Sequence, residues 1–155
     1  MTTLNNWFEV KITYDKIGTE DGKQKRVTDT YLFDAMTFTE AEAKAIQHVQ
    51  PYMSGEFTVA AIKRAKIYEI FDNNEGDIWF KAKVYFIVID PEKGKEKKVA
   101  SIMLVQASDL EQSRKLLEVA MKGTMSDYVI AKLEETPILE VVPYASPKEV
   151  KSESE

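Results

Sequence analysis

The sequence predicts an α+β fold made by tandem duplication of a ββαβ unit, with six mainly antiparallel strands, two helices and a pseudo-twofold axis. Three observations lead to this prediction. The segment FTVAAIKRAKIYEIF, residues 57–71, recurs as YVIAKLEETPILEVV, residues 128–142. Likewise WFEVKI, residues 7–12, recurs as WFKAKV, residues 79–84. A glycine-bearing hairpin loop and a helix-capping sequence stand between these segments in both copies, so one supersecondary unit is repeated.

The first strand of each unit shows the period-2 alternation of a half-buried strand. In residues 7–15, Phe8, Val10 and Ile12 fall on one face, and Trp7 falls on the other with the charged positions. The charged loop KIGTEDGKQKR follows and leads to a second strand over residues 27–36. In the second copy, residues 79–84 and 99–107 repeat these two strands.

A capping box predicts the start of each helix. In this motif a hydroxyl accepts a hydrogen bond from an unpaired backbone N–H of the first turn, and an acidic side chain three residues later accepts from the backbone N–H of the capping residue. The first box is Thr37–Glu40 and predicts a helix to about Met53, where Ser54-Gly55 ends it and the glycine takes a left-handed conformation. The second box is Ser108–Glu111, and its helix ends at Gly123.

The last strand of each unit is predicted to span residues 57–71 and 128–142. In the first copy it is either one long strand or a strand bent around Ala60-Ala61, and in the second Pro137 interrupts it and suggests an edge or a bulge. The short turn at 72–77 predicts that residues 67–71 pair antiparallel with residues 78–88. By pseudo-symmetry the last strand then pairs with the first. Two arrangements satisfy this, one six-stranded sheet or two three-stranded sheets with exchanged strands.

Length and composition predict one intracellular domain. Residues 1–144 form a single domain with repeats at 7–71 and 79–142, and residues 145–155 form a flexible charged tail. The absence of cysteine excludes a disulfide framework and fits a cytoplasmic location. No signal-peptide pattern or membrane-length apolar run occurs, so no membrane partner is expected. The net charge of −5 argues against general nucleic-acid binding but leaves a local site open.

Ordered sequence runs resemble a domain-of-unknown-function family found in Bacteroidetes and their phages and mobile elements. The runs are WFEVKITYDK, FTEAEA, SGEF, IKRA, WFKAKV, MLVQA, MKGTM followed by DY, and VVPY. They extend over nearly the whole chain, from Trp7 to Tyr144. The resemblance implies an intracellular role associated with phages or mobile elements, and it implies no activity or catalytic residue.

The candidate binding residues are aromatic and basic side chains that period-2 alternation places together. Trp7 shares a strand face with Lys11, and Trp79 shares one with Lys81 and Lys83. An aromatic ring among lysines on an open sheet suits base stacking with phosphate contacts. The plainer interpretation is that each tryptophan caps the core or a subunit interface and the lysines are solvated. Further basic candidates lie in the first hairpin loop and the third strand: Lys25, Arg26, Lys63 and Arg64.

The chain offers little for catalysis. Glu69 and Glu140 are matched carboxylates that could share a proton or a metal near a dyad, although strand alternation more often turns such residues outward. His48 is the only histidine, and we expect it on the helix surface. No nucleotide, metal or hydrolase motif occurs, so the sequence predicts no cofactor.

These observations favour a non-enzymatic interaction or assembly protein that binds a protein partner or itself. Both faces of the predicted sheet carry apolar positions, and two helices cover only one face, so a partner subunit is expected on the other. Nucleic-acid or nucleotide binding through the tryptophan–lysine face and the basic loops is the first alternative. A small enzyme built around Glu69 and Glu140 is the second.

Overall fold

The computed structural model describes residues 6–17, 22–74 and 76–144, and the chain divides into two compact units. Unit 1 contains the residues up to 65 together with those from 140 onward, and unit 2 contains residues 66–139. Within these described residues the fold is α+β, with two helices and eight strands in two four-stranded sheets. The expected flexible tail, residues 145–155, lies outside the described residues.

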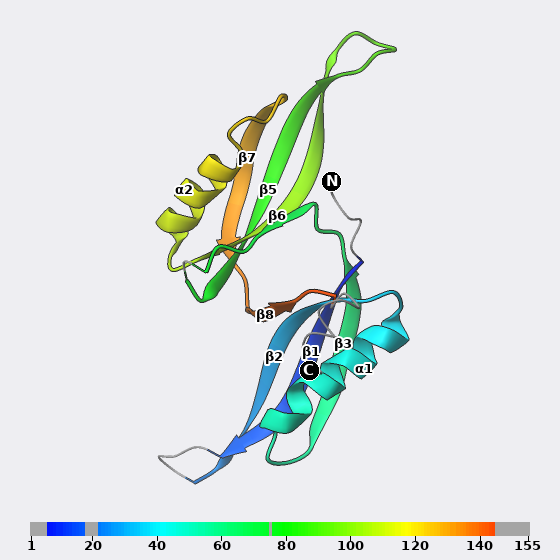
Figure 1. Cartoon of the computed structure of the whole chain (residues 1–155), viewed down its shortest axis with the longest axis vertical. Helices are drawn as coiled ribbons and strands as arrows, with labels where there is room; N and C mark the ends of the chain where they lie inside the picture. The colour runs from blue at the N-terminus through cyan, green and yellow to red at the C-terminus, as the bar shows by residue number, and fades with distance from the viewer. Residues whose placement is uncertain (1–5, 18–21, 75, 145–155) are drawn as a thin grey trace, which may run out of the picture. The chain divides into compact units, whose positions relative to one another are not determined.

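Unit 1 is a sheet with the strand order β3-β1-β2-β8 and one helix on one face. Figure 1 shows α1 lying across this sheet. Its elements are β1 (Trp7–Ile17), β2 (Gln24–Asp34), α1 (Phe38–Val49), the 3-10 turn η1 (Gln50–Tyr52), β3 (Phe57–Ala65) and β8 (Ile138–Val142). The central strand β1 pairs antiparallel with both β2 and β3.

Unit 2 repeats this arrangement with the strand order β4-β6-β5-β7. Its elements are β4 (Glu69–Phe71), β5 (Ile78–Ile89), β6 (Glu96–Ala107), α2 (Leu110–Ala120) and β7 (Asp127–Glu135). Strand β5 is central and pairs antiparallel with β6 and β7, whereas β4 runs parallel to β6. Helix α2 lies beside β7 and β6 (Figure 1).

Each sheet has one helix-covered face that holds its core. Phe8, Val10 and Ile12 are fully buried against α1, as the alternation of the first strand predicts. In unit 2, Ala82 and Val84 have the same role against α2. The remaining buried core residues of the two units are Tyr31, Phe33, Ala35, Ala41, Ala45 and Val49 in unit 1, and Met103, Val105, Leu117 and Met121 in unit 2.

The strand count corrects the sequence prediction, because each long third strand is broken in two. Residues 66–68 separate β3 from β4, and Thr136 and Pro137 separate β7 from β8. Proline has no N–H to donate to a ladder, so a strand stops readily at such a position. The Thr136 hydroxyl, which bonds the Trp79 carbonyl oxygen at 2.7 Å and accepts from the Ile138 N–H at 3.2 Å, stabilises the break.

The predicted pairing of residues 67–71 with residues 78–88 is also wrong. Strand β4 pairs in parallel with β6, with Glu69 opposite Met103. Since β6 and β7 already pair with the two edges of β5, β4 can add only to an outer strand of the sheet, and it pairs with the outer edge of β6. For the same reason β8 joins β2 and not β1, whose edges are taken by β2 and β3.

The helix-capping predictions hold in the first helix and shift by one residue in the second. Thr37 Oγ1 accepts from the Glu40 N–H at 3.1 Å, and the Glu40 carboxylate accepts from the Met36 N–H at 3.2 Å. In α2 the cap is Asp109, not Ser108, and it accepts from the Gln112 N–H at 2.8 Å. Both aspartate and serine side chains suit this position, so sequence alone does not distinguish two neighbouring caps.

The helix ends differ from one another. Helix α1 stops at Val49, earlier than predicted, because Pro51 cannot continue the ladder and the chain tightens into η1. The expected left-handed conformation is absent at Gly55 but present at Gly123, where φ is +87°. Gly123 therefore has the stopping role that the sequence predicts, and Pro51 takes that role in unit 1.

Candidate functional site

The two tryptophans lie on the predicted sheet face but are not exposed. Trp7 is 6% and Trp79 is 4% exposed, and neither belongs to the helix-side cores. An indole buried to this extent has no free face on which a base can stack. The tryptophans therefore act as packing residues in this structure, and any aromatic stacking surface has to come from another residue.

The basic candidates of unit 1 do not form one cluster. Lys63 Nζ lies 3.8 Å from Glu9 Oε1, while the neighbouring Arg64 guanidinium lies 5.4 Å from the Phe8 ring centroid on the helix-covered face. Lys11 is exposed between these positions. Lys25 and Arg26 are exposed at the hairpin end of β2, whose loop residues 18–21 lie outside the described residues. Adjacent strand residues point to opposite faces, which separates Lys63 from Arg64.

Unit 2 gathers its basic residues around a tyrosine. Lys83 Nζ lies 5.4 Å and Lys98 Nζ 6.0 Å from the centroid of the Tyr85 ring. Lys132 is the register partner of Lys83 on β7. We call this surface the Tyr85 face, and it comprises Lys81, Lys83, Tyr85, Lys98, Lys132 and Glu134. Period-2 counting from Trp79 reaches Tyr85, so the signal for this ring is present in the sequence.

The predicted basic loop between β5 and β6 is a tight turn. The Asp90 N–H donates to the Lys95 carbonyl oxygen at 2.8 Å, the Glu92 N–H donates to Asp90 Oδ1 at 2.9 Å, and Gly94 has φ of +64°. Figure 1 shows this hairpin extending beyond the other strands of its sheet. All side chains from Pro91 to Ala100 are exposed, so the lysines of the hairpin are open to solvent.

A second surface of unit 2 is an open groove between α2 and β7, with a volume of about 740 Å³. It is lined by Arg114, Glu118, Lys122, Tyr128, Ile130, Ala131, Lys132 and Leu133. Strand β7 is at the end of the strand order, so one side of its backbone pairs with β5 and the other borders the groove. Three of the lining side chains are basic and one is acidic, in a chain whose net charge is −5. We call it the α2–β7 groove.

A polar cluster lies on the helix-covered face of unit 1. His48 Nε2 is 2.9 Å from Glu140 Oε2, and the His48 ring meets Tyr31 and Phe33 edge-on at 5.9 and 5.5 Å. This corrects the expectation that His48 is a surface residue, because its side chain is only 30% exposed. The sequence contains no local signal for this contact, since Glu140 lies on a strand that begins far along the chain.

The same cluster shifts the ionisation of two tyrosines. Burial raises the pKa of Tyr31 to about 12, helped by the charges of Asp29 and Glu140 and by Tyr14. The Tyr14 hydroxyl donates to Asp29 Oδ2 at 2.9 Å, and this hydrogen bond raises the pKa of Tyr14. The Tyr14 hydroxyl is paired with Asp29 and His48 with Glu140, so these polar groups of the cluster already have protein partners.

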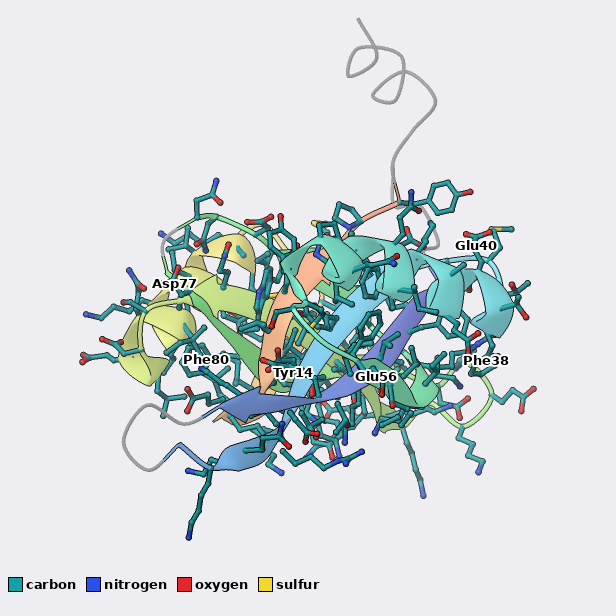
Figure 2. All side chains as sticks on the ribbon, turned by 90° about the horizontal axis from the view of Figure 1, so that it is seen from below. Tyr14, Phe38, Glu40, Glu56, Asp77 and Phe80 are labelled. Carbon is teal, nitrogen blue, oxygen red and sulfur yellow. The ribbon has the colours of Figure 1, made fainter. Side chains whose placement is uncertain are left out.

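The small groove beside this cluster is formed by the hairpin ends of β1 and β2 and by residues 52–56, which precede β3. It has a volume of about 530 Å³, and its lining includes Tyr14, Asp15, Tyr52 and Glu56. Figure 2 labels Tyr14 and Glu56, which lie near each other at this end of unit 1. Lys16 is the only basic side chain among these lining residues, and they include no pairing of a nucleophile with a base. We therefore assign this groove no chemistry.

The two glutamates of the paired-glutamate hypothesis belong to different units. Glu69 is on β4 in the sheet of unit 2, and Glu140 is on β8 in the sheet of unit 1, where His48 is its partner. Among residues 6–17, 22–74 and 76–144, no group of three histidines or carboxylates is placed to hold a metal ion.

Comparison with known proteins yields one match. A family model described as a domain of unknown function, DUF4494, matches residues 6–144. No curated protein and no solved structure matches the chain.

Proposed function

The chain belongs to the DUF4494 family, and from this premise and the geometry of unit 2 we propose that the protein is a non-enzymatic interaction module. Its docking surface is the α2–β7 groove. Its partner is an extended, acidic segment of another protein, which adds as a further strand to β7. The single observation that carries the proposal is that β7 is an edge strand bordering a groove whose charged lining is three basic side chains and one acidic one.

The backbone of β7 supplies the affinity in this proposal. An edge strand presents unpaired N–H and C=O groups along one side, and an added strand satisfies them. Strand β7 has nine residues, long enough for several such bonds. Tyr128 and Ile130 line the groove beside it and offer apolar contact to alternate side chains of the added strand.

Charge decides which segment fits. Lys122 lies just beyond the end of α2, and Lys132 lies on β7 opposite Lys83, so one wall and the floor of the groove both carry positive charge. Arg114 is partly neutralised by Glu118, whose Oε1 is 3.0 Å from Arg114 Nη1. A second copy of the same edge would place like charges opposite one another, which disfavours β7–β7 self-pairing. An acidic segment is the complementary occupant.

The test is selection from a phage-displayed library of random dodecapeptides against the full chain. We expect enriched peptides to be acidic with alternating apolar residues. Lys122→Glu should weaken the binding of an enriched peptide about tenfold, because the substitution replaces one attractive charge contact with a repulsive one. Lys115→Glu is the matched control, because Lys115 is on the same helix, pairs with Glu111 and does not line the groove.

Hydrogen exchange distinguishes strand addition from simple charge attraction. Peptide binding should slow amide exchange in β7 and leave β6, which is paired on both sides, unchanged. Enrichment of basic peptides, or equal binding to Lys122→Glu and wild type, would contradict the proposal.

We also propose that the two units arose by duplication. The register of β1 with β2 is the same as that of β5 with β6 when counted from Trp7 and Trp79. The support extends to an irregularity: the β1–β3 pairing shifts after Lys11, and the β5–β7 pairing shifts after Lys83. Each shift leaves one alanine, Ala60 or Ala131, without a partner, and such bulges are retained as features of a fold.

The proposal places the module inside the cell, associated with phages or mobile elements of Bacteroidetes. Its support is the resemblance of the sequence runs and a composition without cysteine. None of the described helices is long and apolar enough to cross a membrane. Fractionation of cells that produce a tagged full chain tests the location, with recovery in the soluble cytoplasmic fraction as the expected result.

A further inference from the structure

We propose that the Tyr85 face of unit 2 binds single-stranded nucleic acid, with Tyr85 stacking on a base and the surrounding lysines contacting phosphates. This inference goes beyond the α2–β7 groove. The face is formed by alternate residues of β5 that point away from the helix-side core, whereas the groove borders α2, and the two surfaces share Lys132 on β7. It also replaces the buried Trp79 with Tyr85 as the stacking ring.

The position of the ring follows from strand alternation. Ala82 and Val84 are buried in the helix-side core, so Lys81, Lys83 and Tyr85 emerge on the opposite face of β5. Tyr85 is half-buried, whereas Trp79 on the same face is buried. An amphipathic ring held by its own strand loses little conformational freedom on stacking.

Part of the positive charge on the Tyr85 face is not compensated by a carboxylate. Glu134 Oε1 is 3.5 Å from Lys81 Nζ, and Glu134 Oε2 is 3.4 Å from Lys132 Nζ, so this one carboxylate serves two lysines. Neither Lys83 nor Lys98 has a carboxylate partner within the described part of the chain, and both approach the Tyr85 ring. A polyanion would supply the missing negative charge.

Unit 1 lacks this combination at the corresponding place. Thr13 stands in the position of Tyr85, two residues beyond the bulge in each case. It is buried, and its hydroxyl is 3.2 Å from that of Thr28. Lys11 is present where unit 2 has Lys83, but there is no ring beside it. The stacking surface is therefore a property of unit 2 and not of the repeated fold.

The chemistry selects a single strand. A base can stack on the Tyr85 ring only if it is not already stacked in a duplex, and lysines spaced across neighbouring strands suit a flexible backbone. Base–aromatic stacking depends little on base identity, so weak sequence preference is expected. With about three phosphate contacts, raising the salt from 50 to 200 mM should weaken binding by roughly 20-fold.

The experiment uses fluorescence anisotropy with the full chain and 5′-labelled (dT)20 and (U)20 at 50 mM NaCl. Wild type should bind both. The double variant Lys83→Glu/Lys98→Glu and the variant Tyr85→Ala should each bind at least about tenfold more weakly, while Tyr85→Phe retains binding because it keeps the ring. Lys115→Glu is the control for a charge reversal elsewhere in unit 2. Circular dichroism melting shows whether each variant is folded.

Several results would overturn the inference. These are no binding of either oligonucleotide at 50 mM NaCl, equal binding by wild type and the Lys83/Lys98 double variant, and unchanged binding by Tyr85→Ala. Binding of a duplex or of inorganic polyphosphate as tight as that of (dT)20 would show charge attraction without stacking. Lys122→Glu should weaken peptide binding in the groove and leave oligonucleotide binding unchanged, so the two proposals fail independently.

Discussion

His48 Nε2 on the last turn of α1 lies 2.9 Å from Glu140 Oε2 on β8. One helical turn earlier, Lys44 Nζ lies 3.4 Å from the centroid of the Tyr144 ring. Val142, between these two contacts, packs against the core of unit 1. Helix α1 therefore contacts the last described strand at Glu140 and the chain just beyond that strand at Tyr144.

This arrangement predicts that Glu140→Ala loosens β8. The unfolding free energy should fall by about 0.5–1 kcal/mol, because the pair is partly exposed and screened by solvent. Amide exchange should accelerate in β8 and remain unchanged in β5. Chemical denaturation and hydrogen exchange measure the two effects. Glu118→Ala is the control, since its pair with Arg114 is exposed on α2 and should contribute only about 0.3–0.5 kcal/mol.

The raised pKa of Tyr31 predicts a loss of stability in alkali. Ionisation of this buried phenol is disfavoured in the folded chain, where its pKa is about 12, relative to its ordinary value of 10.0. Its stabilising contribution is therefore complete below pH 10 and is lost as the pH rises from 10 toward 12. Urea denaturation at pH 8 and at steps between pH 9.5 and 11.5 measures this slope.

The matched variant for that experiment is Tyr31→Phe. It removes the ionisable hydroxyl and keeps the ring that packs beside Phe33 and His48. We expect a shallower loss of stability between pH 10 and 12 than in wild type. An identical slope in the two proteins would show that other tyrosines, including Tyr14, cause the alkaline transition.

The two helix caps predict similar costs. Thr37→Ala removes the acceptor for the Glu40 N–H, and Asp109→Ala removes the acceptor for the Gln112 N–H. Each should lower the unfolding free energy by about 1 kcal/mol. Ser108→Ala should cost less, because the cap of α2 is Asp109. A larger loss for Ser108→Ala than for Asp109→Ala would place the cap at the residue that the sequence favours.

Gly76 predicts a steric effect of a single methyl group. A Cβ at Gly76 would overlap the carbonyl of Ala107 and the backbone nitrogen of Ser108, which cannot move aside as a flexible side chain can. Gly76→Ala should therefore lower the unfolding free energy by about 1–3 kcal/mol. Gly55→Ala is the control, since a Cβ there meets open space, and it should leave stability unchanged or raise it by up to about 1 kcal/mol. Thermal or urea unfolding checks both.

Much of the local structure could be predicted because it depends on neighbouring residues. The Thr37–Glu40 box identified the start of α1, since its two hydrogen bonds join residues within four positions. Alternation along residues 7–12 identified which face of β1 is buried, because side-chain direction in a strand follows from residue parity. Both predictions needed no knowledge of the rest of the chain.

The candidate site was predicted only in part. Lys81 and Lys83 were identified from parity, but their aromatic neighbour was expected to be Trp79 and is Tyr85. Odd–even alternation along a strand predicts the sheet face on which a side chain lies. It does not predict whether other parts of the chain bury that side chain. His48 was expected in solvent for a similar reason, because its partner Glu140 is brought near only when β8 pairs in unit 1.

The sequence by itself determined the order of elements, their capping and the buried parity of the first strands, all of which follow from contacts within a few residues. Only the tertiary structure decided where β4 and β8 pair. Each of these short strands follows a break in the chain and can add only where a sheet still has a free edge. Since β1 and β5 are flanked on both sides, only outer strands keep a free edge, and β8 and β4 add to those of β2 and β6. Which edges are free is a property of the assembled sheet.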